Sequence, residues 1–488
     1  MDRFRDPADL LAVLGDWMTG RGPLYRKLAA ALRHAVQDGA LLPGDRLPSE
    51  RDLAGLLAVS RSTVVAAYDQ LRSEGLVDSR QGSGTRVTER PGTPRPDGRV
   101  RGGTATPIFQ RLIDGPGDLI SLAFATEPAV DGLQECLLDL VRDDLPALTS
   151  DTGYHPRGLP VLLEALAERF TAMGLPTSTD QLLVTTGATQ ALVLAAQLYL
   201  RPGATVIVES PSWAGCLDVF RASGATLKGI PLDEEGMDVG ALGKALADSP
   251  AALVYVTPTF HNPTGTLMSA SRRRRIAEIA HRHEVPVLED IAYAARLRDE
   301  QFPAPLAAFA HGAEVLTVGS LAKVVWVGLR IGWIRAPAAI TERLARLKAL
   351  ADLGSPVLDQ ALAARLLPRL TELSQERAPA LRRRLEHLCA QLSKGLPEWR
   401  WRVPDGGSAL WVDLSGVDAQ VFAQVALRHG VEVVPGAAMD PSGAHDSFLR
   451  VPYTFEEETL TELVHRLRGA WADLRGHGPA AVAAPQGG

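Results

Sequence analysis

The chain has 488 residues and a net charge of −6, with 46% hydrophobic and 22% charged residues. This composition is typical of a globular protein with a buried core, and the length allows about three units of about 150 residues. No run of about 18 uncharged apolar residues predicts a membrane span, and the first residues do not resemble a secretory signal. Three widely spaced cysteines argue against a disulfide framework or a metal site. We therefore expect a protein of a reducing cytoplasm.

Charge is unevenly distributed along the chain. Residues 21–88 hold ten Lys or Arg and seven Asp or Glu, a net charge of +3, so the remainder carries −9. The overall negative charge by itself argues against nucleic acid as a partner. A basic N-terminal segment on an acidic body nevertheless suits a DNA-binding function in that segment.

Residues 20–88 contain the pattern of three helices followed by two short extended runs. Apolar residues recur every four positions from Leu24 to Val36 and predict the first helix. After a predicted turn, LLPGDRLPS, Ser49 and Ser60 are typical N-cap residues for a second and a third helix. LVDSRQGSGTRV then predicts a hairpin-like wing. This order predicts a winged helix-turn-helix.

The third helix of such a unit enters the major groove of DNA by its N-terminal residues, here Arg61, Ser62 and Thr63. Arginine can pair with guanine O6 and N7, while hydroxyls reach bases or phosphates. Arg51 is placed to hold a phosphate, and Gly82 at the wing tip lets backbone approach the minor groove. Taken alone, the third helix is equally compatible with an ordinary capped surface helix.

The remainder of the chain divides into three further parts. Residues 89–115 are rich in Pro, Gly, Thr and Arg without periodicity and predict an extended linker. Over residues 116–475, the strand-like runs LLVTTG, TVIVES, ALVYVTP, VPVLED and EVLTVGS alternate with helical stretches. That alternation predicts an α/β domain with a mostly parallel sheet. Residues 476–488 predict a disordered tail.

Lys323 lies just past a strand-like run, in GSLAKVVWVGLRIGW. Pyridoxal phosphate (PLP) chemistry needs one lysine amine that forms an imine with the cofactor. A lysine at such a place is by itself more often a solvated charge, but its neighbours offer a phosphate site. Ser320 and Arg330 can bind phosphate by a hydroxyl and a guanidinium. The turn TTGATQ, at the start of a helix, adds backbone N–H groups of Gly187, Ala188 and Thr189.

Further side chains suit the pyridine ring and an amino-acid ligand. Asp290 follows a buried strand, where a carboxylate can keep the ring nitrogen protonated. Tyr293 and Asn262 can hydrogen-bond the ring O3′, and Trp213 can stack on the ring. Arg450 suits a bidentate grip on a ligand carboxylate. Plainer alternatives are a helix cap for Asp290, a core aromatic for Trp213 and a surface ion pair for Arg450.

Two resemblances join these residues. The string PLYRKL…PGDRLPSERDLA…VSRSTVVAAYDQLRSEGLV…GSGTRV closely resembles the GntR-type winged-helix domain, which implies DNA contacts by the five residues named above. The ordered motifs TTGATQ, PSW, HNPTG, LEDIAY, SLAK, GLR and FLR resemble a fold-type I aminotransferase. This resemblance implies a smaller C-terminal α+β subdomain and PLP bound on Lys323. It also implies a dimer in which Tyr154 reaches the phosphate of the partner subunit's cofactor.

One stretch departs from the aminotransferase pattern. Between Lys323 and Arg330, VVWVG replaces the more usual Thr-Leu-Ala-Pro-Gly. The departure puts Trp326 and Val327 near the predicted ligand entrance, so the size and identity of the ligand stay open.

As a whole, the chain resembles the MocR/GabR family of bacterial regulators, which implies a head-to-tail homodimer in the cytoplasm, bound to the nucleoid when on DNA. We predict a PLP-dependent transcriptional regulator that binds a double-stranded DNA operator. Its aminotransferase-like domain would sense an amino compound, or PLP itself, through imine chemistry at Lys323. An active aminotransferase with an accessory DNA-binding domain is the alternative. In a further variant, a sensor of PLP alone, Arg450 would be structural. The effector, the operator and catalytic turnover stay open.

Overall fold

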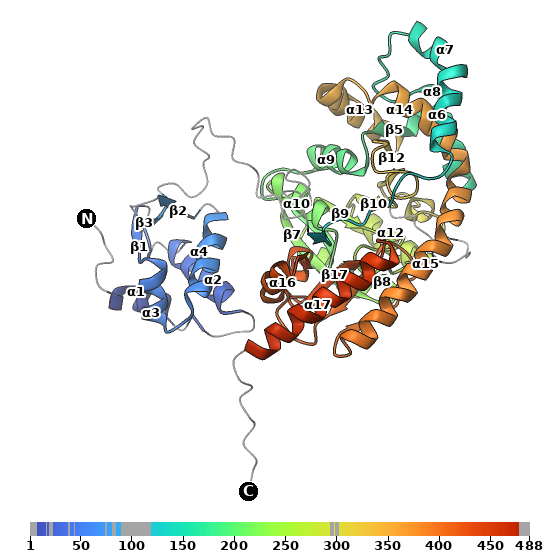
Figure 1. Cartoon of the computed structure of the whole chain (residues 1–488). Helices are drawn as coiled ribbons and strands as arrows, with labels where there is room; N and C mark the ends of the chain where they lie inside the picture. The colour runs from blue at the N-terminus through green and yellow to red at the C-terminus, as the bar shows by residue number, and fades with distance from the viewer. Residues whose placement is uncertain are drawn as a thin grey trace. The chain divides into compact units, whose positions relative to one another are not determined.

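A computed structural model of the chain places two compact units, Met1–Thr104 and Ala105–Gly488 (Figure 1). The residues that the structure describes are 7–15, 17–18, 23–37, 40–42, 44–73, 76–80, 84–88, 119–292, 297 and 302–477. The predicted linker, 89–115, lies outside these residues. So do Gly82, Tyr293 and residues 478–488 of the predicted tail. Each unit is described by itself.

The N-terminal unit combines helices with a small antiparallel sheet. Its helices are α1 (Pro7–Leu14), α2 (Leu24–Gln37), α3 (Glu50–Leu57) and α4 (Arg61–Ser73). Its strands are β1 (Arg46–Leu47), β2 (Val77–Arg80) and β3 (Gly84–Val87), in the order β1-β3-β2. The three predicted helices and the predicted hairpin are therefore confirmed.

Two features of this unit were not predicted. Helix α1 precedes the predicted helices and buries Leu10 and Leu14 in the same hydrophobic core as α2, α3 and α4. The predicted turn before α3 contains β1, which pairs with β3 and buries Leu47. The core therefore extends beyond the segments whose periodicity marks them, because two short apolar stretches also pack into it.

The larger unit is built on an eight-stranded mixed sheet in the order β5-β12-β11-β10-β9-β6-β7-β8. These strands are β5 (Leu182–Thr185), β6 (Thr205–Ser210), β7 (Thr226–Asp233), β8 (Gly236–Met237), β9 (Leu253–Val256), β10 (Val287–Asp290), β11 (Val315–Ser320) and β12 (Gly332–Arg335). Strands β11, β10, β9, β6 and β7 are mutually parallel, whereas β12 and β8 run antiparallel to their neighbours. The five predicted strand runs and the parallel centre are confirmed; β7, β8 and β12 were not predicted.

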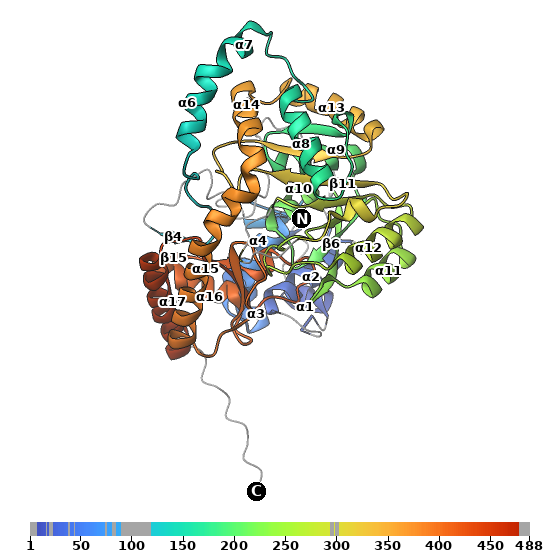
Figure 2. The same ribbon diagram turned by 90° about the vertical axis from the view of Figure 1, so that its right-hand side faces the viewer.

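Helices cover both faces of this sheet (Figure 1). One face packs against α9 (Ala188–Tyr199), α10 (Ala214–Ala222) and α13 (Ala338–Asp352). The other packs against α8 (Pro160–Ala172), α11 (Val239–Asp248), α12 (Ala270–Arg282) and α14 (Val357–Leu366). Helices α6 (Leu133–Asp143) and α7 (Leu145–Ser150) lie beyond this layer (Figure 2). The near-continuous apolar runs of the central strands are explained by burial on two sides.

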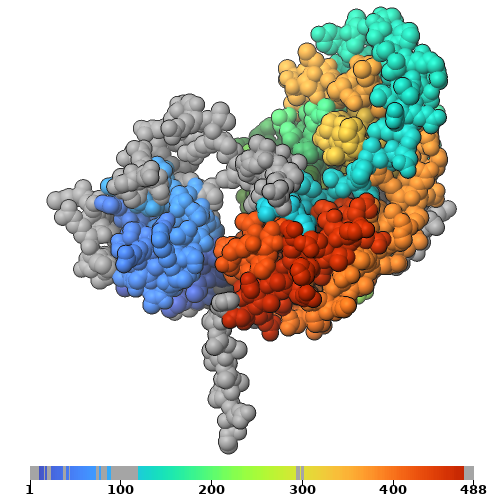
Figure 3. All heavy atoms as spheres, viewed as in Figure 1, coloured from blue at the N-terminus to red at the C-terminus, as the bar shows by residue number. Residues whose placement is uncertain are grey.

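A smaller α+β subdomain follows. Its antiparallel sheet has the order β13-β14-β17-β16, formed by β13 (Arg400–Trp401), β14 (Ala409–Asp413), β16 (Val434–Pro435) and β17 (Phe448–Pro452). It packs with α15 (Leu370–Gly395), α16 (Ala419–Arg428) and α17 (Glu457–His477) on a separate core. In Figure 3 its orange to red residues form one continuous surface. Helix α17 continues past the predicted start of the tail.

The first described residues after the linker join this subdomain rather than the large sheet. Strand β4 (Ile120–Ser121) pairs in parallel with β15 (Val431–Glu432) (Figure 2). Across the part of the chain that the structure describes, no helix combines the length and the apolar character needed to cross a bilayer.

Candidate functional site

The carboxyl ends of neighbouring strands bring the predicted cofactor residues to one edge of the large sheet. Asp290 is the last residue of β10, Ser320 the last of β11 and Ser210 the last of β6. In open α/β sheets, ligands bind beyond the carboxyl ends of the parallel strands. The turn after β5 and the segment that carries Lys323 after β11 extend from the same sheet.

The side chains of Lys323 and Arg450 both contact the short segment that follows β4. Lys323 Nζ donates to the carbonyl of Ala125 at 2.9 Å. Arg450 is 4% exposed, and its Nη1 donates to the carbonyls of Leu122 and Ala123 at 3.2 and 3.4 Å. The alternative of a surface ion pair for Arg450 is therefore wrong. The chain just beyond the linker bridges the predicted imine lysine and the predicted ligand arginine, a contact that no sequence motif marks.

A glycine turn and a guanidinium form the predicted phosphate site. Gly187 caps α9 with a φ of 95°, a left-handed conformation that favours glycine. A Cβ at this position would lie 2.9 Å from Nη2 of Arg330, which donates to the carbonyl of Thr186 at 3.0 Å. Ala188 and Thr189 begin the helix, so their N–H groups have no partner one turn earlier in the helix. Glycine thus lets the guanidinium lie directly against the turn.

Asp290 is held in a buried and partly hydrogen-bonded environment. Its carboxylate, 3% exposed, accepts from the backbone N–H of Ala292 at 2.9 Å and from the hydroxyl of Tyr255 at 3.0 Å. Burial raises the pKa of Asp290, although these two hydrogen bonds act in the opposite direction. Tyr255 was missed from the sequence. A tyrosine within the buried run LVYV was the available signal, since a buried hydroxyl requires a partner.

The remaining predicted residues differ in how far the structure describes them. Asn262 is 5% exposed, and its Nδ2 has no hydrogen-bond partner among the described residues. Ser320 donates to the carbonyl of Ile331 at 3.2 Å. Trp213 caps α10 and is half-buried, whereas Tyr154 is 67% exposed before α8. Tyr293 lies outside the described residues, and its predicted role stays a prediction.

A buried carboxyl–imidazole pair beside this edge was also missed. Glu209 is fully buried on β6, and its Oε2 accepts from the N–H of Thr257 at 2.7 Å. The same oxygen lies 3.5 Å from Nε2 of His261, the residue before Asn262. Burial raises the pKa of Glu209 to about 8 and lowers the pKa of His261 to about 3. Both groups are therefore neutral near pH 7, and the contact is not an ion pair.

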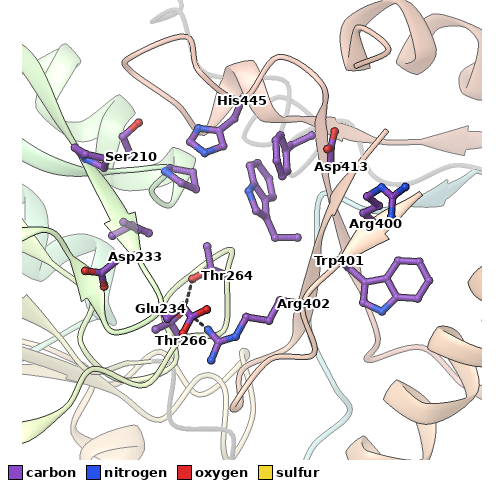
Figure 4. Close-up of a pocket in the computed structure, with 15 residues that line it drawn as sticks. Ser210, Asp233, Glu234, Thr264, Thr266, Arg400, Trp401, Arg402, Asp413 and His445 are labelled. Atoms are coloured by element: carbon purple, nitrogen blue, oxygen red, sulfur yellow. Dashed lines mark hydrogen bonds between the residues drawn. The ribbon is translucent and has the colours of Figure 1, made fainter. Parts of the chain in front are cut away.

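A cavity of about 560 Å³ lies between the large sheet and the small subdomain (Figure 4). Its lining includes Ser210, Asp233, Glu234, Thr264, Thr266, Arg400, Arg402, Trp411, Asp413, His445 and Phe448. Trp411 stacks on Phe448 and pairs in register with Arg450. Of the described residues predicted to hold the cofactor, none lines this cavity. It adjoins the loops of Asn262 and Trp213 through their neighbours Thr264 and Ser210.

Three of the predicted DNA contacts, Arg61, Ser62 and Thr63, lie at the start of α4. The side chain of Arg61 is 71% exposed and pairs with Glu50 at 3.1 Å. Ser62 is exposed and Thr63 half-exposed, and the N–H of Thr63 donates to the capping hydroxyl of Ser60 at 3.2 Å. Arg51 is exposed on α3. The start of this helix is thus both capped and accessible, as groove entry requires.

Comparison with known proteins identifies both units. The model of the gntR family of bacterial regulatory proteins matches residues 24–87, and that of aminotransferase class I and II matches residues 143–467. An uncharacterized HTH-type transcriptional regulator of Bacillus subtilis, YisV, is 31% identical over 474 residues, which cover 91% of this chain and 95% of the relative. The chain belongs to the MocR/GabR-type family. Members of this family join a GntR-type winged helix to an aminotransferase-like domain.

The second unit of this chain is also similar to enzymes. The 2-aminoadipate transaminase of Thermus thermophilus is 32% identical over 312 residues, covering 62% of this chain and 79% of the relative. The crystal structure of LysN, an α-aminoadipate aminotransferase from the same organism, complexed with N-(5′-phosphopyridoxyl)-L-leucine, has a TM-score of 0.68 at 28% identity. The structural match covers 76% of this chain and 95% of LysN.

The cofactor of this aminotransferase-like domain is PLP, and the residues present fit it. Nδ2 of the buried Asn262 amide has no partner among the described residues, a Cβ at Gly187 would lie 2.9 Å from Nη2 of Arg330, and Asp290 offers a buried carboxylate. These groups match a ring hydroxyl, a phosphate and a ring nitrogen, respectively. An amine, Lys323, lies on the segment that follows β11.

Proposed function

We propose that this protein is a PLP-dependent, DNA-binding transcriptional regulator that senses an amino compound, or PLP itself, through imine chemistry at Lys323. One observation carries the proposal: similarity to an HTH-type transcriptional regulator runs through both units, over 91% of the chain. A pure enzyme has no use for a capped, exposed recognition helix. A DNA-binding protein without a sensor has no use for the buried amide and carboxylate and the half-buried amine of the second unit.

Bound PLP supplies an aldehyde that reacts with amines and a ring that withdraws electrons from them. The chain's own residues would hold and orient the cofactor. The N–H groups at the start of α9 and the guanidinium of Arg330 would bind the phosphate. Asp290 would keep a proton on the ring nitrogen, and the amide of Asn262 would donate to the ring oxygen. Arg450, already buried, would exchange its carbonyl partners for the carboxylate of an amino-acid effector.

The segment 122–125 offers a physical route from ligand to linker. Its carbonyls accept from Lys323 and Arg450, the two groups that an amino-acid effector would engage. PLP held on Lys323 would take up the amine that donates to Ala125, and an effector that replaces Lys323 on the cofactor would free that amine again, while its carboxylate would draw Arg450 from the carbonyls of Leu122 and Ala123. The partners of this segment, which directly follows β4, would therefore change with the ligand. A ligand shifts an equilibrium between two states only by its different affinity for them, and these bonds supply such a difference.

We further propose a homodimer with head-to-tail arrangement, in which Tyr154 reaches the phosphate of the partner subunit's cofactor. Exposure of Tyr154, at 67%, supports this role because it leaves the hydroxyl accessible to a second subunit. A regulator of this kind would act in the cytoplasm, on an operator in the chromosome. Two heads of a dimer would read two half-sites, so the operator should contain a repeat.

A spectral and DNA-binding titration tests the proposal. The PLP-loaded protein is titrated with a panel of amino acids and of the corresponding amines that lack the carboxylate. The imine absorbance and the footprint on DNA upstream of its own gene are recorded together. The proposal expects at least one compound, or PLP itself, to change the spectrum and the footprint at the same concentration. Spectral change without any specific footprint would contradict it.

The second candidate function is an active aminotransferase with an accessory DNA-binding domain. Likeness to LysN and to the 2-aminoadipate transaminase favours this reading, and the predicted cofactor residues that the structure describes provide the polar groups that turnover needs. Rapid steady-state transamination across common amino acids, combined with no specific footprint, would establish it. Spectral change that stops at one equivalent, without keto-acid product, supports the regulator.

A further inference from the structure

An ion pair with a buried lysine lies behind the predicted phosphate turn, residues 186–189. The side chain of Lys348, on α13, is 0% exposed and donates to both carboxylate oxygens of Asp352, at 2.9 and 2.7 Å. Burial lowers the pKa of Lys348 more than its bonds to Asp352 raise it. The side chain of Asp352 is 24% exposed. Because burial of the lysine charge offsets much of its attraction to Asp352, the pair is weak evidence for a role in stability. What the pair contacts is therefore more informative.

Gln190 connects this ion pair to the phosphate turn. Its Nε2 donates to Oδ2 of Asp352 at 2.7 Å, and its Oε1 accepts from Nζ of Lys348 at 3.2 Å. The same Oε1 accepts from the backbone N–H of Thr186 at 2.9 Å. Lysine only donates and a carboxylate only accepts, so the two charges fix which way the amide of Gln190 points. The amide oxygen is thereby directed at the turn.

The turn is consequently held from two sides. The N–H of Thr186 is bound by Gln190, and its carbonyl is bound by Arg330 at 3.0 Å. Helices α9 and α13 pack against each other (Figures 1 and 2), which brings the ion pair beneath the start of α9. Backbone N–H groups bind an oxyanion well only when they are already aimed at it.

The other end of the ion pair contacts a different functional segment. Oδ1 of Asp352 also accepts from the N–H of Gly354 at 3.0 Å. Gly354 has a φ of 143°, and a Cβ there would lie 3.1 Å from the carbonyl of His155. His155 follows Tyr154, the residue predicted to reach the partner subunit's cofactor. The ion pair therefore lies between the chain's own phosphate turn and the segment proposed to serve a second subunit.

We propose that Lys348, Asp352 and Gln190 are positioning residues for the cofactor phosphate. They hold the N–H groups at the start of α9 in the orientation that receives the phosphate, without touching it themselves. The inference rests on the proposed function, because it requires PLP as the ligand of this turn. It goes further by assigning phosphate affinity to three residues outside the cofactor motifs.

The test compares PLP with pyridoxal, which has the same ring and aldehyde but no phosphate. The variant K348M/D352L replaces the ion pair with apolar side chains, so that neither charge is left without its charged partner. Its affinity for PLP, measured by imine absorbance, should fall about tenfold, the size of one hydrogen bond to a charged group. Its affinity for pyridoxal should stay within about twofold of the wild-type value.

Two further variants separate positioning from stability. Leu344→Ala removes a fully buried side chain of the same helix outside the network and should leave the ratio of the two affinities unchanged. Gln190→Ala leaves the ion pair in place and should lower the affinity for PLP alone, which keeps the test valid if the double variant does not fold. Equal losses for PLP and pyridoxal, or no loss for either, would overturn the inference. Absence of imine absorbance in the wild type would instead overturn the proposed function.

Discussion

The recognition helix of the first unit and the sheet edge of the second place several predicted functional side chains in opposite environments. Among the predicted DNA contacts, the side chain of Arg61 is 71% exposed, and Arg51 and Ser62 are exposed as well. The predicted cofactor and ligand residues Asp290, Ser320 and Arg450 are 7% exposed or less. Exposed polar groups keep their water until a ligand replaces it, whereas buried ones need partners within the protein. Substitutions should therefore separate binding from folding in the first unit and couple them in the second.

The largest effect is expected at the amine of Lys323, which is half-buried. Lys323→Ala should abolish the imine absorbance of the protein with PLP, since Lys323 is the amine proposed to form the imine. The visible absorbance spectrum of the purified variant with PLP measures the loss of the imine. Lys244→Ala, which removes an exposed lysine on α11, should leave the spectrum as in the wild type. An unchanged spectrum in Lys323→Ala would refute the site.

A pH-dependent effect should follow from burial of Glu209. Its pKa is raised from 4.5 to about 8, so between these pH values the folded protein holds a proton that the unfolded chain has released. The native state then binds more protons, and the free energy of unfolding falls as pH rises through this window. The side chain in Glu209→Gln cannot lose a proton. Between about pH 5 and 8, the free energy of unfolding of this variant should therefore rise by a few kcal/mol relative to that of the wild type. Urea unfolding of both proteins at the two pH values measures the difference, and identical pH dependence would contradict it.

An intermediate effect is expected on the exposed side. Arg61→Ala should weaken specific DNA binding by about 1–3 kcal/mol if Arg61 reads a guanine. Its stability should change by no more than about 0.5 kcal/mol, since its ion pair with Glu50 is exposed. Footprint titration and thermal unfolding measure the two quantities. Arg275→Ala removes an exposed arginine of α12 with a similar ion pair and should change neither. A footprint that survives Arg61→Ala unchanged would remove this residue from the interface.

The smallest effect is expected at the cap of the recognition helix. The hydroxyl of Ser60 accepts from the N–H of Thr63 at 3.2 Å, and Ser60→Ala should lower the free energy of unfolding by about 1 kcal/mol. Ser60→Asp keeps a capping oxygen and should retain stability, but its charge would repel phosphates and weaken DNA binding. Thermal unfolding with a parallel footprint distinguishes the two. If the Ser60→Asp variant is as unstable as Ser60→Ala, the lost capping hydrogen bond does not explain the lower stability.

The two sites also differ in how much of each could be predicted from the sequence. Helix α4 is a local structure: its cap, its apolar face and its exposed arginine all occur within a few residues, so its existence and its candidate contacts followed from the sequence. The aminotransferase-like site joins side chains from β10, β11, α9 and β17. Each residue could be proposed from its motif, because parallel strands end at one sheet edge, but not the partners of each residue.

Those partners arise from packing between distant segments. Tyr255 reaches Asp290 only because β9 and β10 are neighbours in the sheet. Gln190 meets Lys348 and Asp352 because α13 packs on α9. None of these contacts has a spacing or a motif that identifies it in one sequence.

Sequence by itself determined the architecture of this protein: a winged helix-turn-helix followed by an α/β domain, with the residues of a PLP site in the expected order. Periodicity, caps and strand ends suffice for the elements, because they are local consequences of burial and backbone geometry. The resemblance of the ordered motifs to a fold-type I aminotransferase supplied the residues of the PLP site. Tertiary structure alone decided which carbonyls Lys323 and Arg450 contact, and that the segment after the linker supplies both. Main-chain acceptors carry no side-chain signature, so only the folded chain reveals them.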